Sequence, residues 1–187
     1  MNTLREYFEN EIKLFSQLKL EPVDQVIATL ERARLDGRRI FLFGNGGSAA
    51  TASHFACDLG KGTIKPNHPR FKVMTLNDNI PTLTAYSNDV GFDTIFAEPL
   101  ISLAERGDLA IAFSGSGNSP NIVRAVQAAE KIGMTTIGFT GFDGGKLKNQ
   151  VELNVHVPSD LFGMIEDAHL ALTHAICEML KLEHAPH

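Results

Sequence analysis

The sequence has few of the features that mark secreted, membrane-spanning or nucleic-acid-binding proteins. It contains only two cysteines, Cys57 and Cys177, in apolar, helix-like stretches, which predicts reduced thiols in the core. No basic and apolar leader precedes a cleavage site, and no apolar run approaches the roughly 18 residues that a membrane span needs. We therefore expect a cytoplasmic protein without membrane contact.

The sequence also lacks any run of lysine or arginine, and its formal net charge is −5. A polyanion such as DNA is therefore a poor candidate for a direct partner. The composition, 43% hydrophobic and 21% charged, is typical of a folded globular protein. The length suits one α/β domain with its own core, so we expect a single domain over residues 1–187.

Two helices are predicted ahead of the first strand. Apolar residues recur three and four positions apart at Leu4, Phe8, Ile12, Phe15 and Leu18. This spacing predicts a helix over residues 1–20 with one apolar face, and a second helix follows over 23–35. A minimal βαβ unit has no place for these helices, so we expect residues 1–36 to bury their apolar faces against a partner subunit.

From residue 37 onward, short apolar runs alternate with helical patterns. Strands are predicted at residues 40–43, 72–76, 109–113, 135–140 and 151–157. The clearest helices are predicted at residues 48–59, 121–132 and 160–182. This alternation predicts a three-layer α/β/α sandwich around a five-stranded, mainly parallel sheet. In such sheets ligands bind outside the carboxyl ends of the strands.

A glycine loop, Gly44-Asn45-Gly46-Gly47-Ser48, follows the first predicted strand and opens a helix. Glycines allow a tight turn close to a ligand, and the free N–H groups of the following helix face an anion. Ser48 either caps the helix or donates to a ligand oxygen. The loop matches neither the Walker nor the dinucleotide pattern, and an ordinary capped turn is the alternative.

A serine loop, Ser114-Gly115-Ser116-Gly117-Asn118-Ser119-Pro120, follows the third predicted strand. Its hydroxyls, its amides and the positive end of the next helix suit a phosphate without any lysine or arginine. A hydroxyl-rich capping turn is the alternative. Phosphate binding is favoured because both loops are expected at the same edge of one sheet.

Ionisable side chains share faces of two predicted helices. His54 and Asp58 are four residues apart, and Glu166 and His174 are eight apart, with His169 near their edge. Two histidines and two carboxylates on inward faces are costly unless they pair or bind a metal. They form a plausible Zn²⁺ set, and solvated or salt-bridged polar faces are the alternative.

Taken together, the motifs resemble the SIS-domain sedoheptulose 7-phosphate isomerases over nearly the whole chain. The serine loop is common to SIS domains. Narrower matches are Asn-Gly-Gly-Ser with His54, Asn-Asp-x-Gly-Phe at 88–92, Thr-Gly-x-Asp-Gly-Gly-Lys at 140–146, and His174. The resemblance implies a flavodoxin-like SIS fold and a homotetramer.

The resemblance also implies roles for individual residues. It implies a metal, Zn²⁺, held by His54, Asp58, Glu166 and His174, and no organic cofactor. Asp58 would be the catalytic base and His174 the catalytic acid or metal-held partner. The implied substrate-binding residues are Asn45, Gly46, Gly47, Ser48, Asn88, Asp89, Ser114, Gly115, Ser116, Ser119 and Glu166. The family normally has Glu at the position of Asp58, Gln at that of Glu166, and Asp-Arg at 163–164, where this chain has Gly-Met.

The function implied is aldose–ketose isomerisation of a phosphorylated sugar through an enediolate. By analogy, the reaction would convert sedoheptulose 7-phosphate to D-glycero-D-manno-heptose 7-phosphate. A non-catalytic, regulatory sugar-phosphate-binding protein is one alternative. An isomerase for a different phosphosugar is another.

Overall fold

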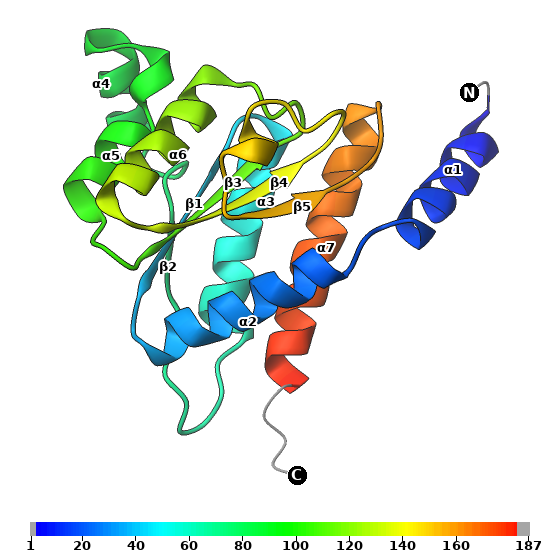
Figure 1. Cartoon of the computed structure of the whole chain (residues 1–187), viewed down its shortest axis with the longest axis horizontal. Coiled ribbons are helices and arrows are strands. Elements are labelled where there is room, and N and C mark those ends of the chain that lie inside the picture. The colour runs from blue at the N-terminus through cyan, green and yellow to red at the C-terminus, as the bar shows by residue number, and fades with distance from the viewer. Residues whose placement is uncertain (1–2, 183–187) are drawn as a thin grey trace.

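A parallel five-stranded sheet forms the middle layer of the computed structural model, which describes residues 3–182 (Figure 1). The strands are β1 (Arg39–Gly44), β2 (Lys72–Thr75), β3 (Leu109–Ser114), β4 (Thr135–Thr140) and β5 (Leu153–His156). Their order across the sheet is β2-β1-β3-β4-β5, and every pairing is parallel. The predicted five-stranded parallel sheet is therefore confirmed.

Helices cover both faces of this sheet (Figure 1). The longer helices are α1 (Leu4–Ser16), α2 (Glu21–Leu35), α3 (Gly47–Cys57), α4 (Ile80–Asp89), α5 (Ala97–Leu103), α6 (Pro120–Ile132) and α7 (Phe162–Leu182). A π-helical turn (Asp58–Gly62) extends α3, and 3₁₀ turns occur at Phe92–Thr94 and Leu147–Asn149. Helices α2, α3 and α7 pack into one core and α5 and α6 into the other, which gives the predicted three layers.

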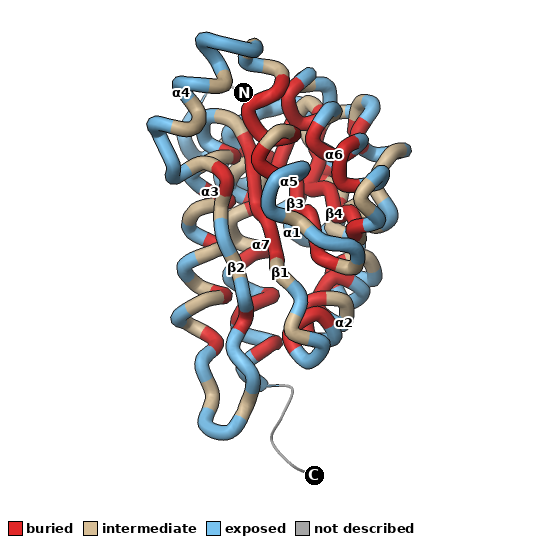
Figure 2. The backbone as a smooth tube through the Cα atoms, turned by 90° about the vertical axis from the view of Figure 1, so that its left-hand side faces the viewer, coloured by how far each residue is buried: buried red, intermediate tan, exposed pale blue. Residues whose placement is uncertain are grey.

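Both faces of the central strands are buried, as Figure 2 shows for β1 and β3. Along β1, Ile40 and Leu42 pack into the α2, α3 and α7 core, whereas Phe41 and Phe43 pack into the opposite core. Successive side chains of a strand point to opposite faces, so a strand covered on both sides needs an unbroken apolar run. This requirement explains why the strands were visible in the sequence.

The register aligns the strand ends that carry the polar loops. Gly44 pairs with Phe113, Ser114 pairs with Thr140, and Thr140 pairs with His156. The loops that follow β1, β3 and β4 therefore leave the sheet at the same edge, as the sequence predicted.

Helix α1 stands away from the sandwich (Figure 1). Leu4, Phe8 and Ile12 are 74%, 53% and 70% exposed, and Leu14 is the buried residue of this helix. A hydrogen bond of 3.1 Å from the Tyr7 hydroxyl to the Asp167 carboxylate links α1 to α7. The apolar face predicted for this helix exists and is largely uncovered in the single chain.

Some expectations need correction. The prediction that both cysteines lie in the core is wrong for Cys57, which is exposed, although both thiols are free as expected. Cys177 is buried, and burial raises the pKa of its thiol to about 12. The last helix begins at Phe162, two residues later than predicted, and β5 is shorter than predicted. Within residues 3–182, no helix combines the length and apolar character needed to cross a membrane.

Candidate active site

The glycine loop forms the start of α3 directly after β1. Gly46 is the N-cap residue and has a φ of 55°, a left-handed conformation that favours glycine. The Asn77 side chain fixes the strand end, because its amide nitrogen donates to the Gly44 carbonyl at 2.7 Å and its oxygen accepts from the Gly44 N–H. Ser48 lies inside α3 and is not its cap, so the capping alternative is wrong. The backbone N–H groups in the first turn of α3 therefore lie next to the glycine loop and receive no capping bond from a side chain.

The serine loop gives its three hydroxyls different tasks. Ser114 is buried, and its Oγ accepts a hydrogen bond from the Gly117 N–H at 3.1 Å. The Oγ of Ser116 accepts from the Asn118 N–H at 3.3 Å. Ser119 is the N-cap residue of α6, yet its side chain makes no capping bond. Ser114 thus shapes the loop, whereas the part predicted for Ser119 in ligand binding stays a prediction.

Residues 140–147 support the serine loop from behind. The Gly141 N–H donates to the Gly115 carbonyl at 2.8 Å, and the Leu147 N–H donates to the Gly117 carbonyl at 3.0 Å. A Cβ at Gly117 would clash with the Gly144 backbone, so the two segments touch main chain to main chain. The Thr-Gly-x-Asp-Gly-Gly-Lys motif therefore positions the serine loop, a role that sequence reasoning did not assign.

Asn121 joins the two loops and was not among the predicted site residues. Its side-chain amide and that of Asn45 exchange two hydrogen bonds, each 2.9 Å long. Asn121 is 1% exposed, and its oxygen also accepts from the Ile122 N–H. A buried amide needs such partners. In the sequence, the only signal was an asparagine directly after Pro120, which also fits an ordinary first turn of a helix.

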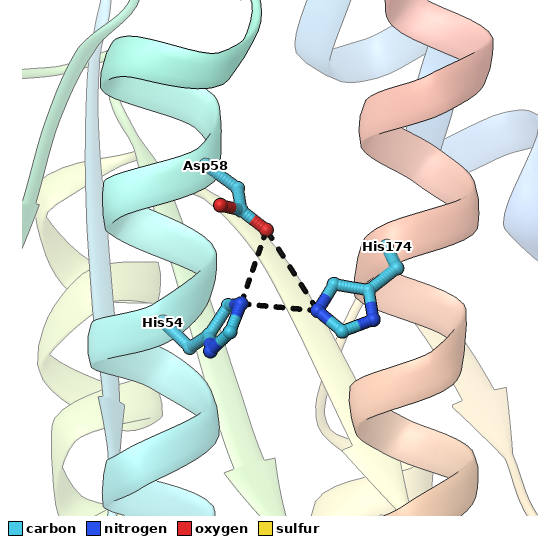
Figure 3. Close-up of side chains that lie close together, drawn as sticks. All are labelled: His54, Asp58 and His174. Carbon is cyan, nitrogen blue, oxygen red and sulfur yellow. Dashed lines mark hydrogen bonds and ion pairs between the residues drawn. The ribbon is translucent and has the colours of Figure 1, made fainter.

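Three of the four predicted metal ligands meet on neighbouring faces of α3 and α7 (Figure 3). The Nε2 atoms of His54 and His174 are 3.0 Å apart. The Asp58 Oδ2 atom lies 3.3 Å from the His54 Nε2 and 3.8 Å from the His174 Nε2. Asp58 opens the π-helical turn at the end of α3, and such turns are frequent at functional sites.

The chemistry and spacing of these three atoms fit a Zn²⁺ ion. Neighbouring ligand atoms around tetrahedral zinc lie roughly 3.3–3.6 Å apart, because each bond is about 2.0–2.2 Å long. The observed separations of 3.0, 3.3 and 3.8 Å bracket that range. The side chains of His54 and His174 are 48% and 49% exposed, so a fourth position faces open space. An open position is typical of catalytic zinc sites.

Glu166 lies apart from this cluster. Its carboxylate occupies the space beside Gly47, where any Cβ would clash with it. Gly47 precedes His54 by seven residues, or about 10 Å along α3. The part assigned to Glu166 as a metal ligand therefore stays a prediction. In this structure its carboxylate borders the start of α3, where the helix dipole favours negative charge.

The remaining histidine of α7 faces the sheet. His169 is buried against Phe113 and Phe139, and its Nε2 lies 3.3 Å from the Thr140 carbonyl oxygen. Burial lowers the pKa of His169 to about 4. It is therefore neutral near pH 7 and does not join Glu166 at a polar face.

Asn88 and Asp89 end α4 and are exposed. The Asn88 side chain donates to the Asp89 carboxylate at 2.8 Å. Their predicted contacts with substrate stay predictions.

Comparison with known proteins places these features in a family. The SIS domain profile matches residues 6–141. The chain belongs to the SIS domain family. A phosphoheptose isomerase of Aquifex aeolicus is 38% identical over 172 residues, covering 91% of this chain and 90% of the relative. A probable phosphoheptose isomerase of Thermoplasma acidophilum is 34% identical, covering 94% of this chain and 96% of the relative.

Solved structures agree with this assignment. The phosphoheptose isomerase GmhA of Neisseria gonorrhoeae superposes with a TM-score of 0.88 at 31% identity, covering 96% of this chain and all of that chain. A phosphoheptose isomerase of Francisella tularensis gives a TM-score of 0.89 at 28% identity, covering 96% and 97%. The SIS fold and the resemblance to phosphoheptose isomerases drawn from the sequence are both confirmed.

Proposed function

We propose that this SIS-domain protein is a phosphosugar isomerase that interconverts sedoheptulose 7-phosphate and D-glycero-D-manno-heptose 7-phosphate. The observation that supports it most directly is the cluster that His54 and Asp58, at the end of the helix that starts at the glycine loop, form with His174 of α7 (Figure 3). A carboxylate beside two imidazoles supplies the base and acid that aldose–ketose isomerisation needs.

The phosphate would bind at the serine loop. The Ser116 and Ser119 hydroxyls and the amino-terminal end of α6 offer hydrogen-bond donors and a partial positive charge. The glycine loop, tied to α6 by Asn45 and Asn121, would border the same end of the substrate. Glu166, beside Gly47, would face its hydroxyl groups.

The spacing along α3 suits a seven-carbon substrate. His54 is about 10 Å from Gly47 along the helix axis. An extended seven-carbon chain spans a similar length, because single bonds of about 1.5 Å advance a zigzag chain by roughly 1.3 Å each. A phosphate at the loops would therefore place the reacting carbons C1 and C2 near Asp58 and His174.

Asp58 is the proposed base. Its Oδ2 faces the two imidazoles, and Figure 3 shows its other carboxylate oxygen turned away from them. That second oxygen would accept the substrate proton. Removal of a proton from C1 of the ketose turns the C–H electron pair into the C1=C2 double bond and places negative charge on the C2 oxygen. Return of the proton to C2, with transfer of the C1 hydroxyl proton to the C2 oxygen, gives the aldose, and His174 would assist this transfer either as an acid or as a metal-held partner.

His54, Asp58 and His174 would also hold Zn²⁺, and Glu166 would join them only after a change of rotamer. When bound, the metal would polarise the substrate carbonyl and stabilise the enediolate oxygen. The protein's own part is to present two imidazole nitrogens and a carboxylate oxygen on two packed helices.

A homotetramer, with the site near a subunit boundary, is part of the proposal. Its support is the uncovered apolar face of α1, formed by Leu4, Phe8 and Ile12. A contiguous exposed apolar face on a helix marks an interaction site.

Proton exchange in D₂O tests the proposal. Sedoheptulose 7-phosphate should lose its C1 proton signal in NMR spectra when the protein and Zn²⁺ are present. The His174→Ala variant should lose bound metal and exchange together while remaining folded. Glu178→Gln is the matched control, because Glu178 pairs with Lys181 at the surface one turn away on α7. Full exchange by the His174→Ala variant, or none by the parent with Zn²⁺, would overturn the proposal.

A further inference from the structure

A cavity with several polar side chains in its lining lies at the outer edge of the sheet, beyond β5. Its volume is about 510 Å³, within the range of small-molecule sites. Its polar lining comes from the α1–α2 linker, the 3₁₀ turn at Leu147–Asn149 and β5: Gln17, Lys19, Lys148, Asn149, Asn154 and His156. Strands β3 and β4 separate β5 from β1, so this cavity is distinct from the glycine loop and the histidine cluster.

Three basic side chains converge on this cavity although the chain as a whole is acidic. Burial and the charges of Lys148 and Lys19 lower the pKa of His156, and the charge of Asp143 opposes them. Neither lysine has a salt-bridge partner among residues 3–182. Positive charges beside a concave surface, which the charge of Asp143 offsets only in part, create a local field that attracts anions.

The hydrogen bonds of Thr140 determine which nitrogen carries the hydrogen when the His156 ring is neutral. The Thr140 hydroxyl donates to the Asn154 Oδ1 at 3.1 Å. Its oxygen therefore accepts from the His156 Nδ1, which is also 3.1 Å away. Neutral His156 then has its lone pair on Nε2, and protonation turns that nitrogen into a second donor. The Asn154 oxygen is occupied, which leaves its NH₂ group as a further donor.

We propose that this cavity binds a small dianionic ligand, such as a phosphorylated metabolite, between Lys19, Lys148 and His156. The two ammonium groups supply charge, and the Asn154 amide and the His156 Nε2–H supply directed hydrogen bonds. Binding is coupled to proton uptake, because the anion favours charged His156. Among the charged and titratable groups that face His156, Lys19 and Lys148 disfavour its protonation and Asp143 favours it, whereas His169 is neutral near pH 7.

Sulfate is a suitable probe, because it keeps its double charge over the whole working pH range. We expect added sulfate to shift the ring resonances of His156 saturably in NMR spectra of histidine-labelled protein. Affinity should be about tenfold higher near pH 6 than near pH 8, because the protonated ring binds the anion.

The double variant Lys19→Gln/Lys148→Gln should weaken sulfate binding at His156 at least tenfold. The matched control, Lys13→Gln/Lys131→Gln, changes the net charge equally at exposed lysines elsewhere and should leave the affinity unchanged. The charge-preserving variant Lys19→Arg/Lys148→Arg should retain binding, which separates loss of charge from loss of fold.

An assay of isomerase activity tests this inference separately from the proposed function. The Lys19→Gln/Lys148→Gln variant should turn over sugar phosphate as the parent does, because neither lysine belongs to the proposed catalytic site. His156 resonances that do not move with sulfate, or equal affinities in the double variant and its matched control, would overturn the proposal.

Discussion

The side-chain amides of Asn45 and Asn121 form a closed pair in which each donates to the carbonyl oxygen of the other at 2.9 Å. This pair connects the glycine loop after β1 to the helix that follows the serine loop. The two loops are thereby held at a fixed separation. Such preorganisation reduces the entropy that binding would otherwise cost.

Replacing Asn121 should therefore impair the site without direct loss of a ligand contact. The Asn121→Ala variant removes both bonds and leaves the Asn45 amide unpaired, at a cost of about 1–3 kcal/mol. We expect KM for the sugar phosphate to rise about tenfold, with a smaller change in kcat. Steady-state kinetics checks this, and the Asn121→Asp variant, which keeps one of the two bonds, should be intermediate. Unchanged KM in a folded Asn121→Ala variant would contradict the positioning role.

We expect the three serines of the serine loop to differ in role, two binding the ligand and one stabilising the loop. Ser119→Ala and Ser116→Ala each remove a donor, so sugar-phosphate affinity should fall by about 1–2 kcal/mol with little change in Tm. Ser114→Ala should instead lower the free energy of unfolding, because the Gly117 N–H loses the buried Ser114 Oγ as an acceptor and keeps only the Ser114 carbonyl. Calorimetric titration and thermal melts of the same three variants distinguish the two effects. Equal ligand affinity in Ser116→Ala, Ser119→Ala and the parent would refute phosphate binding here.

Features that depend on local pattern could be predicted from the sequence. The apolar run at 40–43 marks a strand because both faces of β1 are buried, and His54 and Asp58 share a helix face because of their spacing. The meeting of His54 with His174 spans 120 residues, and no spacing rule predicts it, so it came from the family resemblance. The position of Glu166 depends on a rotamer and on the bare backbone of Gly47, and no sequence pattern encodes it.

Features that depend on a few contacts between distant parts of the chain could not be predicted from the sequence either. The direction of α1 depends on its short interface with α7, where Tyr7 reaches Asp167, 160 residues away in the chain. The Asn121 pair is equally non-local, because it requires two loops to meet at the edge of the sheet. Periodicity identifies which face of a helix is apolar, but it does not identify the surface that covers that face.

Buried His169 should make the protein less stable in acid. Its folded-state pKa is about 4, below the ordinary value of 6.5, so the unfolded chain binds a proton first as the pH falls. The free energy of unfolding should drop by on the order of 3 kcal/mol from about pH 6.5 to about pH 4. Denaturant melts across this range measure the slope, which should flatten in a His169→Phe variant. The same slope in parent and variant would exclude His169 as its source.

The exposed face of α1 should mediate assembly. Phe8→Asp with Ile12→Asp places two carboxylates on that face, and the desolvation cost should dissociate the proposed tetramer. Light scattering at micromolar concentration should show a smaller species, whereas Asn10→Asp, on the opposite side of the helix, should leave the mass unchanged. A parent that is already a monomer would refute the tetramer.

Two roles of Glu166 can be distinguished by experiment: it is either a metal ligand or a residue that faces the substrate. Its carboxylate stands beside Gly47 at the start of α3, where the helix dipole stabilises a negative charge by about 0.3–1 kcal/mol. A dianionic sugar phosphate bound at the neighbouring loops would meet this like charge. The Glu166→Gln variant removes the charge with little change in size.

We expect the Glu166→Gln variant to lower KM for the sugar phosphate severalfold, because the repulsion is gone, and to lower thermal stability slightly. Bound zinc should stay at the parental level, because His54, Asp58 and His174 supply three ligands without Glu166. Because the family normally has Gln at this position, metal analysis after dialysis uses the Glu166→Ala variant, which leaves no ligand atom, and it decides between the two roles. Loss of zinc in this variant would show that the Glu166 side chain moves from Gly47 to the metal. Its carboxylate would then be a metal ligand.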